Sequence, residues 1–214
     1  SFVKERNSNI VFHTDAVQAL SELEIDVKDL NVDLLSISGH KVHAPKGIGA
    51  LYIKSGTDIE NFIFGGSQER SRRAGTENVA GIVGFSKAID ILRIKREENV
   101  SKRFALRNYF LKKIKENFEN YKINGSIENR SSGNINISFL GIDKEMLIMS
   151  MDFKGICVSG GSACSSGSVE NSHVLTAMDI DEELKNSAIR ISFGENNTFE
   201  EIDEFIIALK EIIN

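Results

Sequence analysis

Short apolar runs alternate with helical patterns along this chain. The runs at residues 10–13, 32–38 and 48–53 have the length and apolar content of buried strands, and turn-forming residues separate them. From residue 79 onward apolar side chains recur at helical spacing. The charged residues 93–103 within this region are expected to face solvent. The residues expected on the buried faces are Ile82, Val83, Ile89, Leu92, Phe104, Leu111, Ile114 and Phe118.

The last third of the chain shows a different pattern, typical of a small α+β domain. Residues 134–139 alternate between polar and apolar, which predicts a strand whose Ile135, Ile137 and Phe139 face a core. Residues 198–201 form a capping box that opens a final helix. The residues expected on the buried face of that helix are Phe199, Ile202, Phe205, Ile206, Leu209 and Ile213. A short apolar helix before it is expected to bury three methionines, Met146, Met149 and Met151.

The composition is that of an ordinary soluble chain. Its 214 residues are 41% hydrophobic and 27% charged, enough for one large or two small cores. The net charge of −5 argues against a nucleic-acid surface, although Arg70, Arg72 and Arg73 cluster locally. No apolar run reaches membrane-spanning length, and the first residues show no signal-peptide pattern.

Two cysteines are present, Cys157 and Cys164. Their number and spacing fit neither a disulfide scaffold nor a zinc pair, so we expect no metal site and a reducing, cytoplasmic location. Cys157 lies in an apolar strand and is expected to be buried and inert. Cys164 lies in a loop of small residues, 158–168, and is either a catalytic nucleophile or an incidental loop cysteine.

Lys41 stands just after the apolar run 32–38, between Gly39 and the turn set by Pro45 and Gly47. Open α/β sheets bind their ligands at the C-terminal ends of strands, where this lysine is expected to lie. A partly desolvated amine there has a lowered pKa and can condense with an aldehyde such as pyridoxal phosphate. By spacing alone, Lys41 is also consistent with a surface lysine in a turn.

Other polar residues could serve the same chemistry. Asp15 follows the first strand, where a carboxylate can pair with a protonated pyridine nitrogen or simply cap a helix. Arg190 lies on the polar face of the strand 188–193 and either binds a carboxylate through two parallel hydrogen bonds or is an exposed strand arginine. The glycine-flanked loop 65–78, with Thr76 as a candidate helix cap, is either an anion site or a solvated basic turn.

Four segments, in this order, resemble cysteine desulfurases of the class V aminotransferase group of pyridoxal-phosphate enzymes. They are Asp15 to Gln18, Ser38 to Tyr52, Gly65 to Asn78, and Gly161 to Ser168. The resemblance covers nearly the entire chain. It departs from the family at Ser67, where glycine is usual, and at Asn171, where proline is usual.

The resemblance implies an α/β fold that is the C-terminal part of a fold type I pyridoxal-phosphate enzyme, lacking an N-terminal section. Residues 1–96 would be the C-terminal part of the large cofactor-binding domain and its sheet. Residues 97–214 would be a small α+β domain that carries the cysteine loop. By the same resemblance, the missing section would supply further phosphate contacts and the histidine that stacks on the cofactor ring.

The resemblance also implies a role for individual residues. Lys41 would form the Schiff base with the cofactor, and Cys164 would take the substrate sulfur as a persulfide. The other expected site residues are Asp15 at the ring nitrogen, Gln18 at the ring hydroxyl, Ser38 and His40 at the phosphate, Thr76 at the phosphate of the partner subunit in a homodimer, and Arg190 at the substrate carboxylate.

The implied reaction converts L-cysteine to L-alanine, with the sulfur passed to an iron–sulfur scaffold or another acceptor. Apart from acceptors in tRNA thiolation, no nucleic acid and no membrane are expected as partners. Two alternatives stay open. The chain could belong to another class V enzyme, such as a selenocysteine lyase or an aminotransferase, or it could be a non-catalytic fragment.

Overall fold

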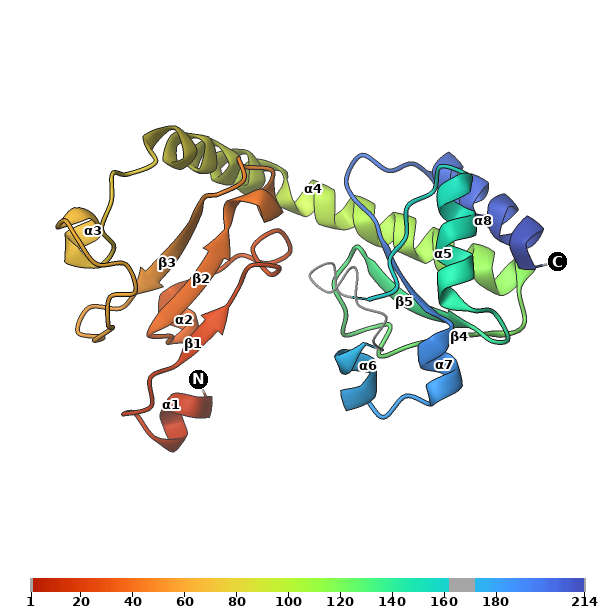
Figure 1. The fold of residues 1–214 in the computed structure, drawn as a ribbon, viewed down its shortest axis with the longest axis horizontal. Coiled ribbons are helices and arrows are strands. Elements are labelled where there is room, and N and C mark those ends of the chain that lie inside the picture. Colours follow the sequence, from red (N-terminus) through yellow and green to blue (C-terminus); the bar gives the residue numbers. More distant parts are fainter. Residues whose placement is uncertain (1, 162–171, 214) are drawn as a thin grey trace. The chain divides into compact units, whose positions relative to one another are not determined.

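The computed structural model describes residues 2–161 and 172–213, and the chain divides into two compact units, Ser1–Glu97 and Glu98–Asn214 (Figure 1). Each unit contains its own three-stranded sheet. The division lies one residue from the boundary expected after residue 96. The identity of the first unit as a cofactor-binding domain stays a prediction.

The sheet of the first unit has the order β1 (His13–Asp15), β2 (Leu34–Ser38) and β3 (Gly49–Ile53). β1 runs parallel to β2, with Asp15 opposite Ser36, and β3 runs antiparallel to β2. Four short helical segments accompany these strands: α1 (Phe2–Arg6), α2 (Val27–Leu30), the 3-10 turn η1 (Gly39–Val42) and α3 (Gln68–Ser71).

Alternation along β2 separates the core of this unit from its polar face. Leu35 is buried with Ala16 and Val32, and Ile37 packs against the neighbouring cluster that contains Phe85. Because successive side chains of a strand point to opposite faces, the two serines of β2 lie on the other side of the sheet. One face of β2 therefore builds the core, and the other carries hydroxyl groups.

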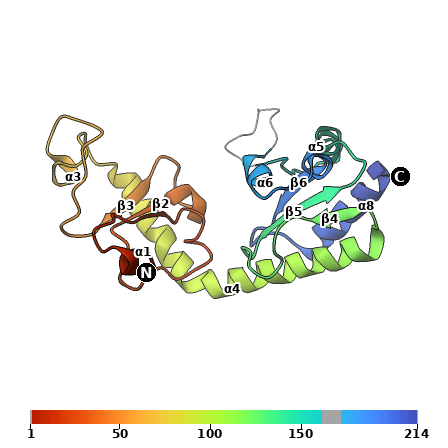
Figure 2. The same cartoon turned by 90° about the horizontal axis from the view of Figure 1, so that it is seen from below.

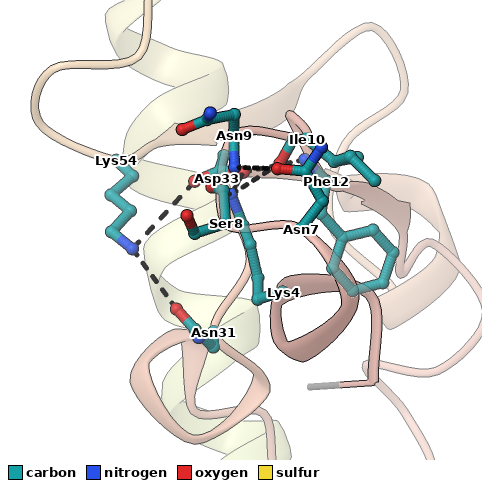
Figure 3. Close-up of polar contacts among 9 residues, drawn as sticks. All are labelled: Lys4, Asn7, Ser8, Asn9, Ile10, Phe12, Asn31, Asp33 and Lys54. Atoms are coloured by element: carbon teal, nitrogen blue, oxygen red, sulfur yellow. Dashed lines mark hydrogen bonds and ion pairs between the residues drawn. The ribbon is translucent and has the colours of Figure 1, made fainter.

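The first strand is displaced from its predicted position. Ile10, expected in a buried strand, is exposed, and β1 begins at His13. The Lys4 ammonium donates to the Ile10 carbonyl (2.6 Å) and forms an ion pair with the Asp33 carboxylate, which also accepts the Phe12 N–H (2.7 Å) (Figure 3). The segment before β1 is thus held by a side chain in addition to the Phe12 carbonyl, which accepts the Asp33 N–H (2.9 Å). Residue periodicity reveals neither contact.

One helix, α4 (Val79–Asn117), spans the boundary between the units. In the first unit it packs through Phe85, Ile89 and Leu92, and Gly81, one turn before Phe85, is buried on the same face. Ile82 lies at the margin of this face and Val83 on the opposite side of the helix, so both residues, expected to be buried, are exposed. Despite its length, neither α4 nor any other helix within the described ranges has an apolar stretch able to cross a membrane.

The charged middle of α4 is not entirely solvated, as had been expected for residues 93–103. Arg103 is only 7% exposed. Its Nε donates to Ser132 Oγ (2.9 Å), and its Nη1 lies 3.7 Å from a carboxylate oxygen of Glu195. The prediction is wrong at this residue because both partners come from distant segments of the chain, and a buried guanidinium needs such partners.

The second unit contains an antiparallel sheet of β4 (Tyr121–Ile123), β5 (Asn134–Phe139) and β6 (Ala188–Ser192), seen side by side in Figure 2. The three residues predicted to face its core are confirmed as fully buried: Ile135 (0%), Ile137 (0%) and Phe139 (1%). The helices of this unit, besides the end of α4, are α5 (Lys144–Phe153), α6 (His173–Ala177), α7 (Glu182–Asn186) and α8 (Phe199–Ile213).

The capping box of the final helix is confirmed. Thr198 Oγ1 accepts the Glu201 N–H (3.2 Å), and Glu201 Oε2 accepts the Thr198 N–H (3.1 Å). The predicted buried face is confirmed for Ile202, Phe205, Ile206 and Leu209, whereas Phe199 is exposed and packs edge-on against Tyr109.

Two of the three methionines expected in the core are exposed. α5 packs through Leu147 and Met151, which lie one turn apart on the same helix face. Met146 and Met149 lie outside that stripe and face solvent. The prediction failed because a short helix buries only one stripe, and methionine is apolar enough to suggest burial at every position.

Asp33 supplies a prediction about acid stability. Its contact with the Lys4 ammonium and the Phe12 N–H hold the pKa of its carboxyl below the ordinary value. A lowered folded-state pKa means that the stabilisation is complete above the unfolded pKa near 4 and is lost as pH falls through the folded value. We expect Asp33→Asn to lower the unfolding temperature at pH 7, and the gap to the unsubstituted protein to shrink below about pH 4.

The control is Asp58→Asn, because Asp58 is exposed. Thermal unfolding followed by circular dichroism between pH 2 and pH 7 measures the gap. A gap that is the same at every pH, or as large for Asp58→Asn, would contradict the role given to Asp33.

Gly39 supplies a second prediction, because it stands where two backbone segments approach closely. Its N–H donates to the Ile48 carbonyl (2.9 Å), and an added Cβ would lie 2.8 Å from Ile48 Cγ2 and 3.1 Å from Ala44 Cβ. We expect Gly39→Ala to cost about 1–3 kcal/mol of unfolding free energy through overpacking. Gly194→Ala is the matched control, since its nearest contact would be Asn197 Oδ1 at 3.6 Å. Equal midpoints in urea unfolding for the two variants would refute the close approach.

Candidate active site

Lys41 lies in the turn η1, directly after β2. The turn is closed by the Ala44 N–H, which donates to the Gly39 carbonyl (3.0 Å), and by His43, whose backbone is left-handed with φ 63°. Val42 is buried in the core, whereas the Lys41 side chain is half-buried. The turn therefore anchors the backbone and leaves the amine accessible at the strand end.

Ser38 and His40 precede this lysine in the sequence and contact each other. Ser38 is the last residue of β2, and its Oγ shares a hydrogen bond of 2.8 Å with His40 Nδ1. A hydroxyl and an imidazole held together next to an amine offer donors for an anionic group. The structure thus brings together three of the predicted site residues in four consecutive positions.

Asp15 ends β1, the strand parallel to β2. Its Oδ1 accepts the Val17 N–H (2.9 Å), a turn that fixes the carboxylate at the strand end. Gln18 follows in the same turn region and is exposed. Because parallel strands end at the same edge of a sheet, Asp15 and the Ser38–Lys41 segment lie at one edge.

His13 is a polar residue of this sheet that the sequence did not single out, since its strand position suggested simple packing. The side chain is exposed, and its Nε2 shares a hydrogen bond of 2.8 Å with Ser36 Oγ on β2. The spacing His13-x-Asp15 beside Ser36-x-Ser38 could have indicated a shared polar face.

Thr76 lies exposed in the loop before α4. It was expected to cap that helix, but the cap is Asn78, whose Oδ1 accepts the Gly81 N–H (3.0 Å). The loop is held by Arg73, whose Nη1 donates to the Gly75 carbonyl (2.9 Å), and by the Gly75 N–H, which donates to a glutamine side chain at 3.1 Å. Thr76 is therefore presented on the surface of the loop and does not serve the helix.

The backbone of this loop is unusual at α3. Glu69, Arg70 and Ser71 have positive φ values of 49°, 58° and 64°. Consecutive left-handed residues other than glycine are rare and cost energy at each position. Ser67, by contrast, has φ −90°, which any residue adopts, so the departure from the family's glycine requires no change in the backbone there.

Arg190 lies in the second unit, on β6. Its backbone pairs with Asn136 on one side and with Ser159 on the other, and its neighbours Ile189 and Ile191 are buried in the core. The guanidinium is half-buried, and among the described residues its Nε has no hydrogen-bond partner. An unpaired donor of this kind suits a carboxylate ligand.

Cys164 lies outside the described residues. Cys157 is exposed, so the prediction that it is buried is wrong. It lies beside two shallow pockets, one that includes Met149 of α5 and one that includes Phe205 of α8. Exposure follows from the alternation that turns Ile156 and Val158 toward the core instead.

Within residues 2–161 and 172–213, no three His, Cys, Asp or Glu side chains gather as a metal site would require. The polar groups at the edge of the first sheet are an amine, two hydroxyl–imidazole pairs and one carboxylate. This set suits an organic ligand that carries an aldehyde and an anionic group.

Known proteins resemble this chain over nearly its whole length. It is 46% identical over 210 residues to a cysteine desulfurase IscS of Clostridium botulinum, an alignment that covers 97% of this chain and 53% of that protein. A solved structure of a NifS-like protein from Rickettsia africae matches with a TM-score of 0.88 and 34% identity, over 99% of this chain and 56% of the other. The structure of SspA in complex with cysteine matches with a TM-score of 0.70 and 34% identity, over 92% and 54%.

These comparisons confirm the predicted fold class, because the chain shares the α/β fold of the NifS-like proteins. The chain spans about half the length of the relatives it matches. The sequence profile described as aminotransferase class-V matches residues 2–205. The chain therefore belongs to the class V aminotransferase family.

Proposed function

We propose that this chain is the part of a pyridoxal-phosphate-dependent cysteine desulfurase that carries the Schiff-base lysine and the sulfur-accepting cysteine. The enzyme would convert L-cysteine to L-alanine and hold the sulfur as a persulfide on Cys164. The observation that carries the proposal is the meeting of Asp15, Ser38, His40 and Lys41 at one edge of a sheet. The identity of 46% with a cysteine desulfurase supports the choice of reaction.

The residues at this edge fit pyridoxal phosphate by their chemistry. Lys41 offers the primary amine that an aldehyde needs, the Ser38–His40 pair offers donors for a phosphate, and Asp15 offers a carboxylate for the ring nitrogen. By family resemblance we place Gln18 at the ring hydroxyl. When bound, the cofactor withdraws electrons from the α-carbon of the substrate.

The residues of this chain would then act as follows. Asp15, whose Oδ1 accepts the Val17 N–H, would offer its carboxylate to the protonated ring nitrogen. Lys41, as a free amine, moves protons to and from the substrate carbons. Arg190 would bind the substrate carboxylate, which is supported by its buried Nε, a donor without a partner among residues 2–161 and 172–213.

Sulfur transfer is assigned to Cys164. Its thiolate attacks the substrate sulfur, an S–S bond forms, and the substrate C–S bond breaks with its electron pair left on carbon. Protonation at that carbon completes L-alanine, so one cysteine and one thiol give one alanine and one persulfide. No external oxidant is required. The persulfide would pass to an iron–sulfur scaffold or another acceptor, such as one in tRNA thiolation. From the cysteine content we propose that this takes place in the cytoplasm.

We further propose a homodimer in which Thr76 of one copy reaches the cofactor phosphate of the other. Thr76 is exposed and does not cap α4, which suits a contact outside its own unit. Nearby in the sequence, Phe62 is 95% exposed and Phe64 is 82% exposed. Two aromatic side chains so exposed favour coverage by another chain.

The half-length match supports one alternative, that this chain is a non-catalytic fragment of such an enzyme. The other alternative, a different class V enzyme, predicts a lysine-bound cofactor without cysteine-dependent sulfur release. Two experiments separate these possibilities.

The first experiment tests the cofactor site. We expect borohydride reduction after addition of pyridoxal phosphate to place a stable pyridoxyl group on Lys41, because this amine is held at the strand end. Peptide mass spectrometry locates the adduct. Lys41→Arg should abolish it, while Lys46→Arg, at an exposed lysine five positions away, should retain it. Adducts scattered over surface lysines, unaffected by Lys41→Arg, would show that this chain alone is not an enzyme.

The second experiment tests the reaction. We expect Cys164→Ala to reduce sulfide release from L-cysteine by about 100-fold or more, because the nucleophile is lost, while the Lys41 adduct remains. Cys157→Ala is the matched control, since it removes an exposed thiol of the same chain. Sulfide release that persists in Cys164→Ala, measured together with alanine, would instead favour another class V activity.

A further inference from the structure

We propose that His13 and Ser36 form a positioning pair that fixes the Asp15 end of the cofactor site. This inference rests on the proposed function, because Asp15 has a cofactor to meet only if that function holds. The pair is defined by the 2.8 Å hydrogen bond between His13 Nε2 and Ser36 Oγ, which crosses from β1 to β2.

The register places Ser36 beside Asp15. The two residues are direct partners in the parallel ladder, and His13, two positions before Asp15, projects from the same face of β1. The Ser36 hydroxyl is therefore next to the position of the Asp15 side chain and is engaged by the imidazole from one side.

Ser36 also holds the residue that follows Asp15. Its carbonyl accepts the Ala16 N–H at 2.9 Å. Ser36 therefore contacts the chain on both sides of Asp15. His13, two positions before Asp15, shares a hydrogen bond with the Ser36 side chain, and Ala16, the residue after Asp15, donates to the Ser36 carbonyl. The Val17 N–H then fixes the carboxylate itself (2.9 Å).

The length of β1 makes the side-chain bond important. β1 has only three residues, so its ladder offers few backbone hydrogen bonds against sliding or fraying. In a long strand, a hydrogen bond between exposed side chains has little effect on the position of the strand, because the backbone ladder fixes it. Here it adds to the backbone contacts of Phe12 and Ala16 that position the strand from which Asp15 projects.

The pair also matches the second serine–histidine contact of the sheet. Ser38 Oγ and His40 Nδ1 share a hydrogen bond of 2.8 Å, and Ser36 and Ser38 lie on the same face of β2. Each serine of β2 therefore contacts one imidazole on this face of the sheet. The Ser38 pair faces the proposed phosphate end, and the Ser36 pair stands at the Asp15 end.

The test measures cofactor affinity and the absorbance spectrum of the bound cofactor between pH 6 and pH 9 in the 214-residue chain. We expect His13→Leu and Ser36→Ala each to weaken pyridoxal-phosphate binding about three- to tenfold, the range that loss of one hydrogen bond allows. The double variant should be no weaker than either single variant, because both remove the same bond. His13→Gln, which places an amide near Nε2, should restore most of the affinity.

His173→Leu, at an exposed histidine of the second unit, serves as the matched control. One outcome overturns this inference alone. In it, the unsubstituted chain forms the Lys41 adduct, and His13→Leu and Ser36→Ala have the same cofactor affinity and the same change of absorbance with pH as the unsubstituted chain. The same holds if His13→Gln loses as much affinity as His13→Leu and all variants lose unfolding temperature in proportion, since that marks a purely structural contact. Failure of the unsubstituted chain to form the adduct overturns the proposed function and this inference with it.

Discussion

The parallel pairing of β1 with β2 is the constraint on which the candidate active site depends. Two parallel strands end at the same edge of a sheet. The register from His13↔Leu34 to Asp15↔Ser36 therefore places Asp15 at the edge where β2 ends and the Lys41 turn begins. A three-residue strand holds this register only with help from outside its ladder. The Asp33 carboxylate anchors the chain before β1, and Ser36 anchors the residue after it.

Core side chains and candidate site side chains lie on opposite faces of the same strands in both units. On β2, Leu35 and Ile37 enter the core, while Ser36 and Ser38 carry hydroxyls on the face of the candidate site. On β6, Ile189 and Ile191 are buried, while Arg190 projects to the other side. The core faces fix the backbone, and the backbone fixes the polar side chains, because a strand cannot turn one face without turning the other.

Part of the fold and of the site could be read from local patterns. The alternation at residues 134–139 determined a buried face, and the capping box at residues 198–201 determined a helix start, because each depends on neighbours within a few positions. Features that depend on distant partners were missed. Arg103 is buried because Ser132 and Glu195, from distant segments, pair with its guanidinium.

The sequence by itself determined β2 and β3 of the first sheet, the turn that carries Lys41 and the family to which the chain belongs. Apolar periodicity and motif spacing are properties of neighbouring residues in the sequence, so they can be recognised without the tertiary structure. The tertiary structure decided which strands pair, in which direction and in which register. Those choices placed His13 against Ser36, because contacts between segments follow from how the whole chain packs and not from the residues next to them.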